Sequence, residues 1–391
     1  MGRLSYLDHA ATTHVDERVV EAMLPYFRER WGNPSSVYSH GRIARRALDE
    51  SRDTVAGVLN CRPNEVLFTS GGSESDNLAI KGVAFARRAE GDHIVTSRIE
   101  HHAVLHTCEW LERHFGFRVT YVDVDRHGMV DPEQYERAVG PGTTVVSIML
   151  ANNEIGTLQP LAQLAEIAHR QGAVFHTDAV QAGGVLDLDV DRLGVDLLSL
   201  SAHKLYGPKG VGVLYLRRGT PLLPQMQGGG QERGIRSGTE DVPGMVGMAE
   251  ALRLAHEEME SRNEHARRLR DRLVEGILEH VPGAHLTGHP TNRLPNNASF
   301  VFEDTDGESI LLNLDQYDIC ASSGSACTSG TLEVSHVLKA LGLPIELARG
   351  SLRLTTGLNA NDADVDRALE VMPQVIERVR AVMPALLGTQ K

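Results

Sequence analysis

Apolar strand-like runs alternate with amphipathic helical stretches from about residue 64 to about residue 260, and this alternation limits the possible folds more than any other feature. The strand-like runs are Val66–Thr69, His93–Thr96, Val119–Val122, Thr144–Leu150, Val174–Thr177, Leu197–Leu200 and Val211–Leu216. Repetition of strand, helix and strand is typical of a mainly parallel sheet that is covered by helices on both faces. We therefore predict an α/β fold whose large domain is a mainly parallel seven-stranded sheet sandwiched by helices.

The chain after Asp241 is strongly helical to about residue 280, and a smaller section of strands and helices follows it. The predicted elements of that section are strands at Ala298–Phe302, Asp318–Ala321 and Ser351–Thr355, and helices at Glu308–Asp315, Glu333–Leu341 and Asp362–Ala381. We predict a large domain over residues 14–260. Residues 1–13 and 261–391 would then form a smaller α/β domain.

The composition excludes several classes of function. No run approaches the roughly 20 apolar residues that a membrane-spanning helix needs. The first residues carry no apolar core of a secretion signal. Acidic residues outnumber basic ones by 52 to 39, which gives a net charge of −13 and argues against nucleic acid as a ligand. We expect a cytoplasmic protein that contacts neither membranes nor nucleic acid directly.

The polar segment Ser201–Gly210 places one lysine, Lys204, between two runs that read as buried strands. Removing an ammonium group from water is costly and lowers its pKa. A desolvated lysine is suited to forming a Schiff base with a carbonyl group, either on a substrate or on pyridoxal phosphate. The alternative is a surface lysine in a turn, so the other partners of a cofactor must be sought elsewhere.

Further polar segments follow other predicted strands, at the ends where an open α/β sheet keeps its ligand crevice. Gly72 and Ser73 follow the first strand and precede a helical stretch, so free backbone N–H groups there can hold a phosphate. The alternative is a helix cap made by Ser73 and Asp76. A nucleotide-binding P-loop is excluded because the chain contains no Gly-Lys dipeptide.

Histidines and a carboxylate follow the next strands. His101 and His102 are candidates for acid–base groups, metal ligands or polar loop residues, and the spacing of His102 and His106 would let them share a metal on one helix face. Asp178 ends a buried run, where a carboxylate is unusual unless it is paired. Its carboxylate can accept a hydrogen bond from a protonated ring nitrogen. The alternative is that it caps the segment that follows.

One cysteine stands out among Cys61, Cys108, Cys320 and Cys327. The chain has no Cys-x-x-Cys pair, so any special cysteine should act alone. Small residues surround Cys327 in Ala321–Gly330, which predicts an exposed, mobile loop over residues 321–332 that can deliver a thiol to a bound substrate. Arg353, within a predicted strand, is a good bidentate clamp for an amino-acid carboxylate, or else part of a structural ion pair.

Six motifs are spread over nearly the whole chain. They are Tyr6-Leu-Asp-His-Ala-Ala-Thr-Thr, Trp31-Gly-Asn-Pro-Ser-Ser, Ser201-Ala-His-Lys, Arg236-Ser-Gly-Thr, Ser322-Ser-Gly-Ser-Ala-Cys and Arg349-Gly-Ser-Leu-Arg. Through these motifs the chain resembles the cysteine desulfurases, class V pyridoxal phosphate enzymes of the fold type I transferases, in the NifS- and IscS-like group.

The resemblance implies a role for each matching residue. Lys204 would carry pyridoxal 5'-phosphate, Asp178 would face its ring nitrogen, and His101 would stack on the ring. The remaining implied contacts are Gln181 and Asn153 near the phenolic oxygen, Gly72, Ser73, Ser201 and His203 on the phosphate, Thr239 on the phosphate from the second subunit of a homodimer, and Arg353 and Asn153 on the substrate carboxylate.

The implied activity converts L-cysteine to L-alanine and leaves the sulfur on Cys327 as a persulfide. The sulfur would then pass to an acceptor protein, either an iron–sulfur scaffold or a thiolation enzyme. Another fold type I enzyme, such as a selenocysteine lyase or an aminotransferase, is the first alternative. We expect no metal in the site, although a metal hydrolase built on His101, His102, His106 and His176 is a second alternative.

Overall fold

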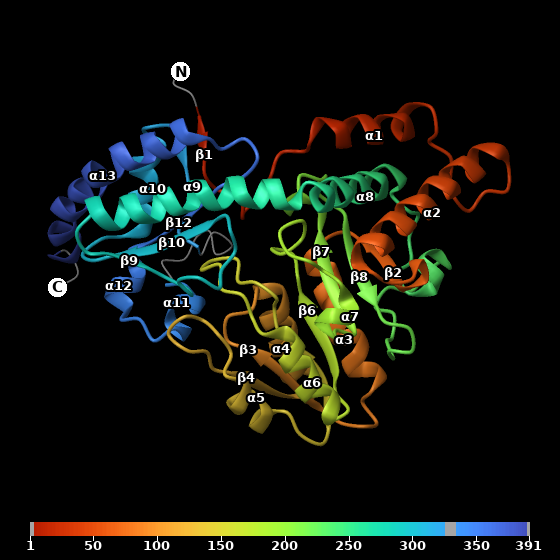
Figure 1. Cartoon of the computed structure of the whole chain (residues 1–391). Helices are drawn as coiled ribbons and strands as arrows, with labels where there is room; N and C mark the ends of the chain where they lie inside the picture. The colour runs from red at the N-terminus through yellow and green to blue at the C-terminus, as the bar shows by residue number, and fades with distance from the viewer. Residues whose placement is uncertain (1–3, 325–333, 389–391) are drawn as a thin grey trace.

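The computed structural model describes residues 4–324 and 334–388. A seven-stranded sheet with the order β2-β8-β7-β6-β5-β3-β4 forms its centre (Figure 1). The strands are β2 (Val66–Thr69), β3 (His93–Ser97), β4 (Arg118–Val122), β5 (Thr143–Ser147), β6 (Val174–Asp178), β7 (Leu197–Ser201) and β8 (Gly212–Leu216). Only β8 runs antiparallel to its neighbours. The predicted α/β fold with a mainly parallel seven-stranded sheet is confirmed.

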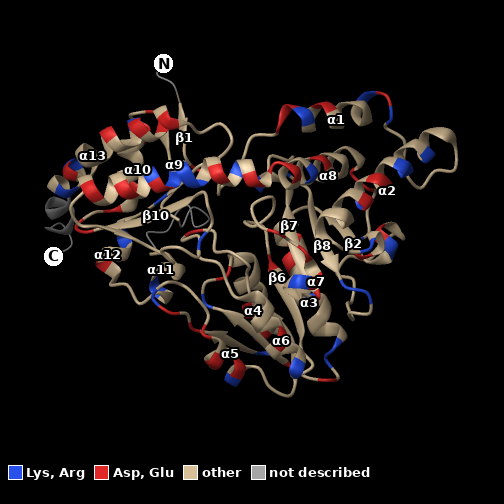
Figure 2. Ribbon diagram, viewed as in Figure 1, with Lys and Arg blue, Asp and Glu red and all other residues tan. Residues whose placement is uncertain are grey.

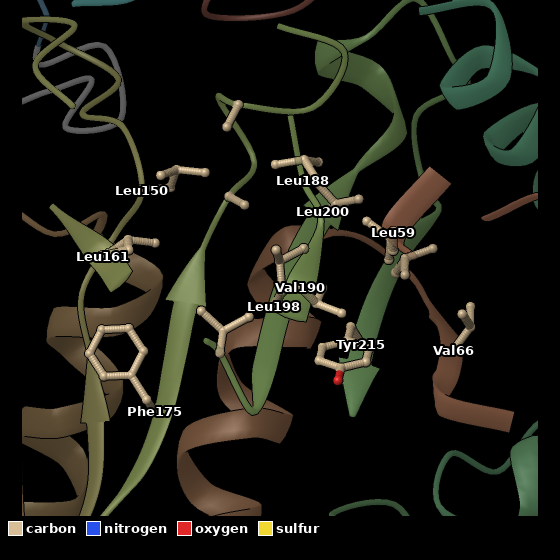
Figure 3. Packing of buried hydrophobic residues seen from close by; sticks show 14 of the residues in the cluster. Leu59, Val66, Leu150, Leu161, Phe175, Leu188, Val190, Leu198, Leu200 and Tyr215 are labelled. Atoms are coloured by element: carbon tan, nitrogen blue, oxygen red, sulfur yellow. The ribbon is translucent and has the colours of Figure 1, made fainter. Parts of the chain in front are cut away.

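Helices cover both faces of this sheet because its strands are buried on both sides. Phe175, Leu198 and Tyr215 belong to one core cluster (Figure 3), which also takes in residues of α2 (Ser39–Leu59), α6 (Leu161–Arg170) and α8 (Val242–Glu257). On the other face, Leu67 and Leu197 pack with α3 (Gly72–Ala86) and α4 (His102–Phe115). The near-continuous apolar runs in the sequence reflect this double burial.

A second, antiparallel sheet has the order β12-β10-β9. Its strands are β9 (Ala284–Leu286), β10 (Asn297–Phe302) and β12 (Ser351–Thr355), and its core cluster includes residues of α9 (Met259–His280), α10 (Gly307–Asp315) and α13 (Asp362–Gly388). Because α8 belongs to the first core and α9 to the second, we propose the domain boundary near residue 260.

Two short strands and several further helices complete the fold. A parallel pair joins β1 (Ser5–Tyr6) to β11 (Ile319–Cys320), so the N-terminal segment lies against the second sheet's side of the molecule. The other helices are α1 (Glu17–Arg28), α5 (Pro132–Ala138), α7 (Val190–Leu193), α11 (His336–Ala340) and α12 (Ile345–Arg349), with short 3₁₀ turns at Pro63–Glu65, Ala202–Lys204 and Gln231–Gly234.

Most elements differ from the sequence-based boundaries by a residue or two, and β5 and α11 differ by three at one end. β5 ends at Ser147 rather than Leu150, because its pairing with β3 stops at that residue. Beyond it, the N–H groups of Ile148 and Leu150 still donate to carbonyl oxygens of β6. Helix α11 begins at His336 rather than Glu333, because the Ser335 hydroxyl caps its first turn.

Charged residues lie mainly on the helices, with both signs interspersed, as the red and blue bands along α9 and α13 show (Figure 2). These two helices are joined by exposed ion pairs, among them Arg268 to Asp362 at 2.5 Å. Within residues 4–324 and 334–388, no helix is both long and apolar enough to cross a membrane.

One buried ion pair fixes the turn at Glu232. Arg52 on α2 contacts Glu232 at 2.6 Å, with exposed side-chain fractions of 9% and 2%. Glu232 also accepts a hydrogen bond from the N–H of Phe68, and Arg52 donates to the carbonyl of Val66. Because Glu232 and Arg233 both adopt positive φ angles, of 44° and 59°, these contacts hold a strained turn against β2. The same loop leads to Thr239.

We predict that Glu232→Ala lowers the free energy of unfolding by about 3–5 kcal/mol, because it leaves the Arg52 charge buried and unpaired. Glu136→Ala is the matched control: it breaks the pair with Arg170, whose side chains are 55% and 49% exposed, and should cost about 0–1 kcal/mol. Urea unfolding measures both values. Equal small losses would contradict the assignment of Arg52 and Glu232 as a buried, fixed pair.

Candidate active site

The polar segments that follow β2, β3, β6 and β7 meet in one cavity of about 450 Å³. Strands that run in parallel end at the same edge of the sheet, which is why segments far apart in the sequence converge there. The predicted site residues that line the cavity are Gly72, Ser73, His101, Asn153, Asp178, Gln181, Ser201, His203, Lys204 and Arg353. Thr239 is exposed and does not line it. Cys327 lies outside the described residues.

Lys204 ends the 3₁₀ turn that directly follows β7. Its Nζ donates hydrogen bonds to the carbonyl oxygens of Ala10 and Ala11, each at 2.6 Å. Gln181 donates to the same Ala10 oxygen at 3.1 Å. The N-terminal segment therefore forms part of the cavity wall and fixes the position of the amine. The alternative of a surface lysine is wrong, because Lys204 lines the cavity and is partly buried.

Asp178 and Asp76 form a pair of buried carboxyl groups beside His101. Each of the three residues places an oxygen or nitrogen within 4.8 Å of the others. Burial raises the pKa of both carboxyl groups, while nearby His101 and Lys204 lower the pKa of Asp178. Two carboxylates this close in a buried site cannot both ionise readily, so Asp76 takes up a proton first and Asp178 keeps its charge. Asp178 also accepts the N–H of Val180, which is the local cap predicted as an alternative.

The first turn of α3 offers an anion site at the cavity wall. The helix begins at Gly72, and its N-cap, Gly71, provides no side-chain acceptor. The alternative of a cap by Ser73 and Asp76 is therefore wrong. A Cβ atom at Gly72 would lie 2.7 Å from a methyl carbon of Val180, so this turn packs too closely against its neighbour for a larger residue. Free N–H groups at a helix N-terminus attract an anion.

Of the adjacent pair His101 and His102, His101 lines the cavity. It is the N-cap of α4, and its Nδ1 accepts the N–H of Ala103 at 3.1 Å, so the neutral ring carries its proton on Nε2. His102 instead packs against His106 and His336, with ring centroids 4.8 and 4.7 Å away. On the far wall, burial and the neighbouring lysines lower the pKa of His203 to about 4, so this ring is neutral at pH 7.

The four histidines of the metal hypothesis do not form one ligand set. His176 lies inside the sheet on β6, where its ring nitrogens bond to Ser147 and Ser199 at 2.9 and 3.0 Å, and burial lowers its pKa to about 3. Within the described residues, the one group with metal-ligand spacing is Asp76, His101 and Asp178. These residues line the same cavity as Lys204.

Arg353 lies in the middle of β12 and reaches the cavity from the second sheet. Its guanidinium donates to the Asp8 carboxylate and to the carbonyl oxygen of Asn153, both at 2.8 Å. The side chain is 4% exposed, and its Nε is buried without a partner. The alternative of a structural ion pair is observed, and because Arg353 also lines the cavity, the carboxylate clamp stays a prediction.

Four carboxyl groups in or beside the site were not predicted: Asp76 lines the cavity, and Asp8, Glu100 and Glu154 neighbour lining residues in space or in sequence. Asp8 stands within a motif that was used only for the resemblance, and Asp76 was interpreted as part of a cap. A buried carboxylate next to a predicted ligand segment is the signal that would have identified Glu100, beside His101, and Glu154, beside Asn153.

Comparison with known proteins identifies the relatives of this chain. Residues 5–368 match the model of the aminotransferase class-V family. The chain is similar to the cysteine desulfurase IscS of Methanosarcina thermophila, with 53% identity over 97% of this chain and 93% of that protein. A solved NifS-like protein is 39% identical with a TM-score of 0.91, covering 96% of this chain and all of the other. A structure titled SspA in complex with cysteine is 37% identical with a TM-score of 0.79, covering 90% and 99% of the two chains.

Glu100 is fully buried next to His101. One carboxyl oxygen accepts hydrogen bonds from the Ser97 hydroxyl at 2.5 Å and the N–H of Met149 at 3.1 Å, and the other has no partner. Burial raises its pKa from 4.5 to about 8. The folded protein therefore binds this proton more tightly than the unfolded chain.

We predict that Glu100 makes the protein less stable as the pH rises from its ordinary pKa of 4.5 to about 8. The folded state holds more protons in this range, so rising pH favours the unfolded chain, and the contribution of the protonated group is lost above about pH 8. Glu100→Gln cannot ionise and should show a shallower decline. Urea unfolding of both proteins across this range measures the difference, and parallel profiles would contradict the prediction.

Proposed function

The chain belongs to the class-V aminotransferases and, within them, to the cysteine desulfurases, and we propose that its cavity holds pyridoxal 5'-phosphate on Lys204. Its activity is the conversion of L-cysteine to L-alanine, with transfer of the sulfur to a cysteine of the enzyme. The observation that carries the cofactor proposal is the presence of an amine, a buried carboxylate and an anion site in one cavity.

The lining residues fit the polar groups of the cofactor. Lys204 would hold it through Nζ, Asp178 would face the ring nitrogen, and His101 would lie over the ring. Gln181 and Asn153 would be near the phenolic oxygen, and the phosphate would be held by Gly72, Ser73, Ser201 and His203. The uncapped first turn of α3 supports the phosphate position, because its N–H groups need an acceptor.

When bound, pyridoxal phosphate supplies an electron sink for the Cα of the substrate. Asp178, as the carboxylate that keeps its charge, favours a proton on the ring nitrogen that faces it. The amine of Lys204 and the imidazole of His101 are the groups available to take the proton from Cα. Because His203 is neutral at pH 7, it would contact the phosphate as a hydrogen-bond donor and not as a positive charge.

Sulfur transfer then depends on the position of the substrate and of one thiol. Arg353 and Asn153 would hold the carboxylate of L-cysteine, and the thiolate of Cys327 would attack the substrate's sulfur. The carbon–sulfur bond breaks as a sulfur–sulfur bond forms, and the electron pair of the broken bond ends, with a proton, on alanine. L-cysteine and an enzyme thiol thus give L-alanine and an enzyme persulfide without an external oxidant.

We propose that two copies of the chain form a homodimer in which Thr239 of each completes the phosphate site of the other. In its own chain Thr239 is exposed and does not reach the cavity. The chain also exposes large apolar side chains on and beside α1, which a second copy can cover. They are Val20, Leu24, Phe27, Trp31, Val37 and Tyr38.

The persulfide would pass to an acceptor protein, either an iron–sulfur scaffold or a thiolation enzyme. We place this chemistry in the cytoplasm, where thiols stay reduced. Cys61, Cys108 and Cys320 are all free, which is compatible with that compartment. A selenocysteine lyase or an aminotransferase of the same fold is the alternative, and the need for Cys327 distinguishes these activities.

We predict that the purified protein shows a yellow visible absorption band that borohydride fixes covalently on Lys204. L-cysteine should give alanine and, with an added reductant, an equal amount of sulfide. Cys327→Ala should keep the absorption band and lose the release of sulfide, because only the attacking thiol is removed. A colourless protein that takes up no pyridoxal phosphate would overturn the cofactor proposal, and undiminished sulfide release by Cys327→Ala would overturn the role of the thiol.

The dimer is tested by mixing two inactive variants. Lys204→Ala lacks the cofactor lysine, and Thr239→Ala should bind the cofactor weakly. A mixed dimer has one complete site, because the Lys204 of one chain meets the Thr239 of the other. We therefore expect cofactor binding and activity to return when the two variants are unfolded and refolded together. Recovery no greater than the sum of the separate variants would show that Thr239 does not act across subunits.

A further inference from the structure

Asp8 is a carboxylate beside the cavity that neither the proposed cofactor contacts nor the proposed substrate contacts include. It lies in the N-terminal segment, shortly after β1, and accepts a hydrogen bond from Nη2 of Arg353 at 2.8 Å. The side chains of Arg353 and Asp8 are 4% and 16% exposed. The pair is therefore largely shielded from water, where the attraction between opposite charges is stronger than on the surface.

The backbone on both sides of Asp8 is fixed to the strand that carries its partner. The N–H of Thr355 on β12 donates to the carbonyl oxygen of Leu7 at 2.7 Å, and the N–H of His9 donates to the carbonyl oxygen of Thr355 at 3.4 Å. Arg353 lies on the same strand, between its paired neighbours. The carboxylate of Asp8 and the guanidinium of Arg353 are thus held at one place relative to each other.

The guanidinium of Arg353 keeps hydrogens for a ligand. An arginine side chain carries five N–H groups. One on Nη2 goes to Asp8 and one on Nη1 goes to the carbonyl oxygen of Asn153, while Nε is buried without a partner among the described residues. One hydrogen then remains on each Nη atom, and a carboxylate has two oxygens to accept them. Asp8 and the carboxylate of a ligand would therefore share one guanidinium.

Glu154 is a second carboxyl group near the guanidinium, but its side chain bonds elsewhere. Burial raises the pKa of Glu154, and Ser335 and Arg353 are the strongest of the groups that lower it. Its Oε2 lies 2.5 Å from the Ser335 hydroxyl. Within residues 4–324 and 334–388, Asp8 is thus the carboxylate that forms an ion pair with Arg353.

Two carboxylates that share one guanidinium repel each other, so Asp8 weakens the attraction of Arg353 for the carboxylate of a ligand. We propose that Asp8 is a positioning and specificity-determining residue, which holds the guanidinium in place and limits the strength of the carboxylate clamp so that the product can leave. L-cysteine and L-alanine carry the same carboxylate, so a clamp that binds the substrate too tightly also retains the product. This inference rests on the proposed function, in which Arg353 holds the substrate carboxylate.

The test measures the affinity of the cofactor-loaded enzyme for L-alanine and for L-alaninamide, which lacks the negative charge. The visible spectrum follows the binding of each ligand. In each protein, the ratio of the two affinities measures the carboxylate clamp, and comparing this ratio between proteins cancels the difference between the two ligand amines. Neither measurement involves a thiol of the enzyme.

Asp8→Asn keeps an acceptor oxygen for Arg353 and loses the charge. We expect it to raise the preference for L-alanine over L-alaninamide by about three- to thirtyfold, because the guanidinium is no longer shared with a second anion. Asp8→Glu keeps the charge and should leave the preference near that of the unaltered enzyme. Asp362→Asn is the matched control, because it removes an exposed carboxylate that pairs with Arg268 on the surface, and it should leave the preference unchanged.

The outcomes separate this proposal from the function on which it rests. If Arg353→Gln has the same preference as the unaltered enzyme, the proposed carboxylate clamp itself fails. If Arg353→Gln lowers the preference but Asp8→Asn does not raise it, or if Asp8→Glu raises it as much as Asp8→Asn does, the role of Asp8 is overturned. If Asp8→Asn does not fold, Asp8→Ser replaces it as a neutral side chain with an acceptor oxygen, and an unchanged preference again overturns the proposal.

Discussion

The common direction of the central strands is the constraint on which the site depends. Because β2, β3, β5, β6 and β7 all end at one edge of the sheet, the segments that follow them lie close together at that edge. β8 reverses direction, so the chain that leaves Lys204 can return beside β7 without crossing that edge. The position of the cavity thus follows from the strand order and direction. Its binding properties depend on the side chains that line it.

The positive and negative side chains at this cavity, within the part of the chain that the structure describes, balance each other. Asp178 and Asp8 supply negative charges, while Lys204 and Arg353 supply positive ones. Burial keeps two further groups neutral, because it lowers the pKa of His203 and raises the pKa of Asp76. Burying a charge lowers the stability of the folded protein. A cavity with few ionised side chains therefore destabilises the fold less than one in which every titratable side chain is ionised.

The sequence predicted the sheet well and the contacts around it less well, for a physical reason. Strand and helix periodicity is local, so β2 and β12 match their predicted ranges and most other strands differ by a residue or two. The residue types needed for a cofactor are also visible locally, as at Lys204. The bonds from Lys204 to Ala10 and from Arg353 to Asp8 join residues 194 and 345 positions apart, and no periodic pattern encodes them.

Arg353 on β12 makes two kinds of contact, one through its side chain and one through its backbone. Its side chain reaches the cavity between Asp8 and Asn153, and its backbone pairs with Ser322, at the root of the segment that carries Cys327. A shift of β12 by one residue would turn the guanidinium to the opposite face of the sheet and move that root with it. The buried pairing of β12 with β10 therefore fixes the positions of the Arg353 guanidinium and of Ser322 together, so both depend on the register of one strand pair.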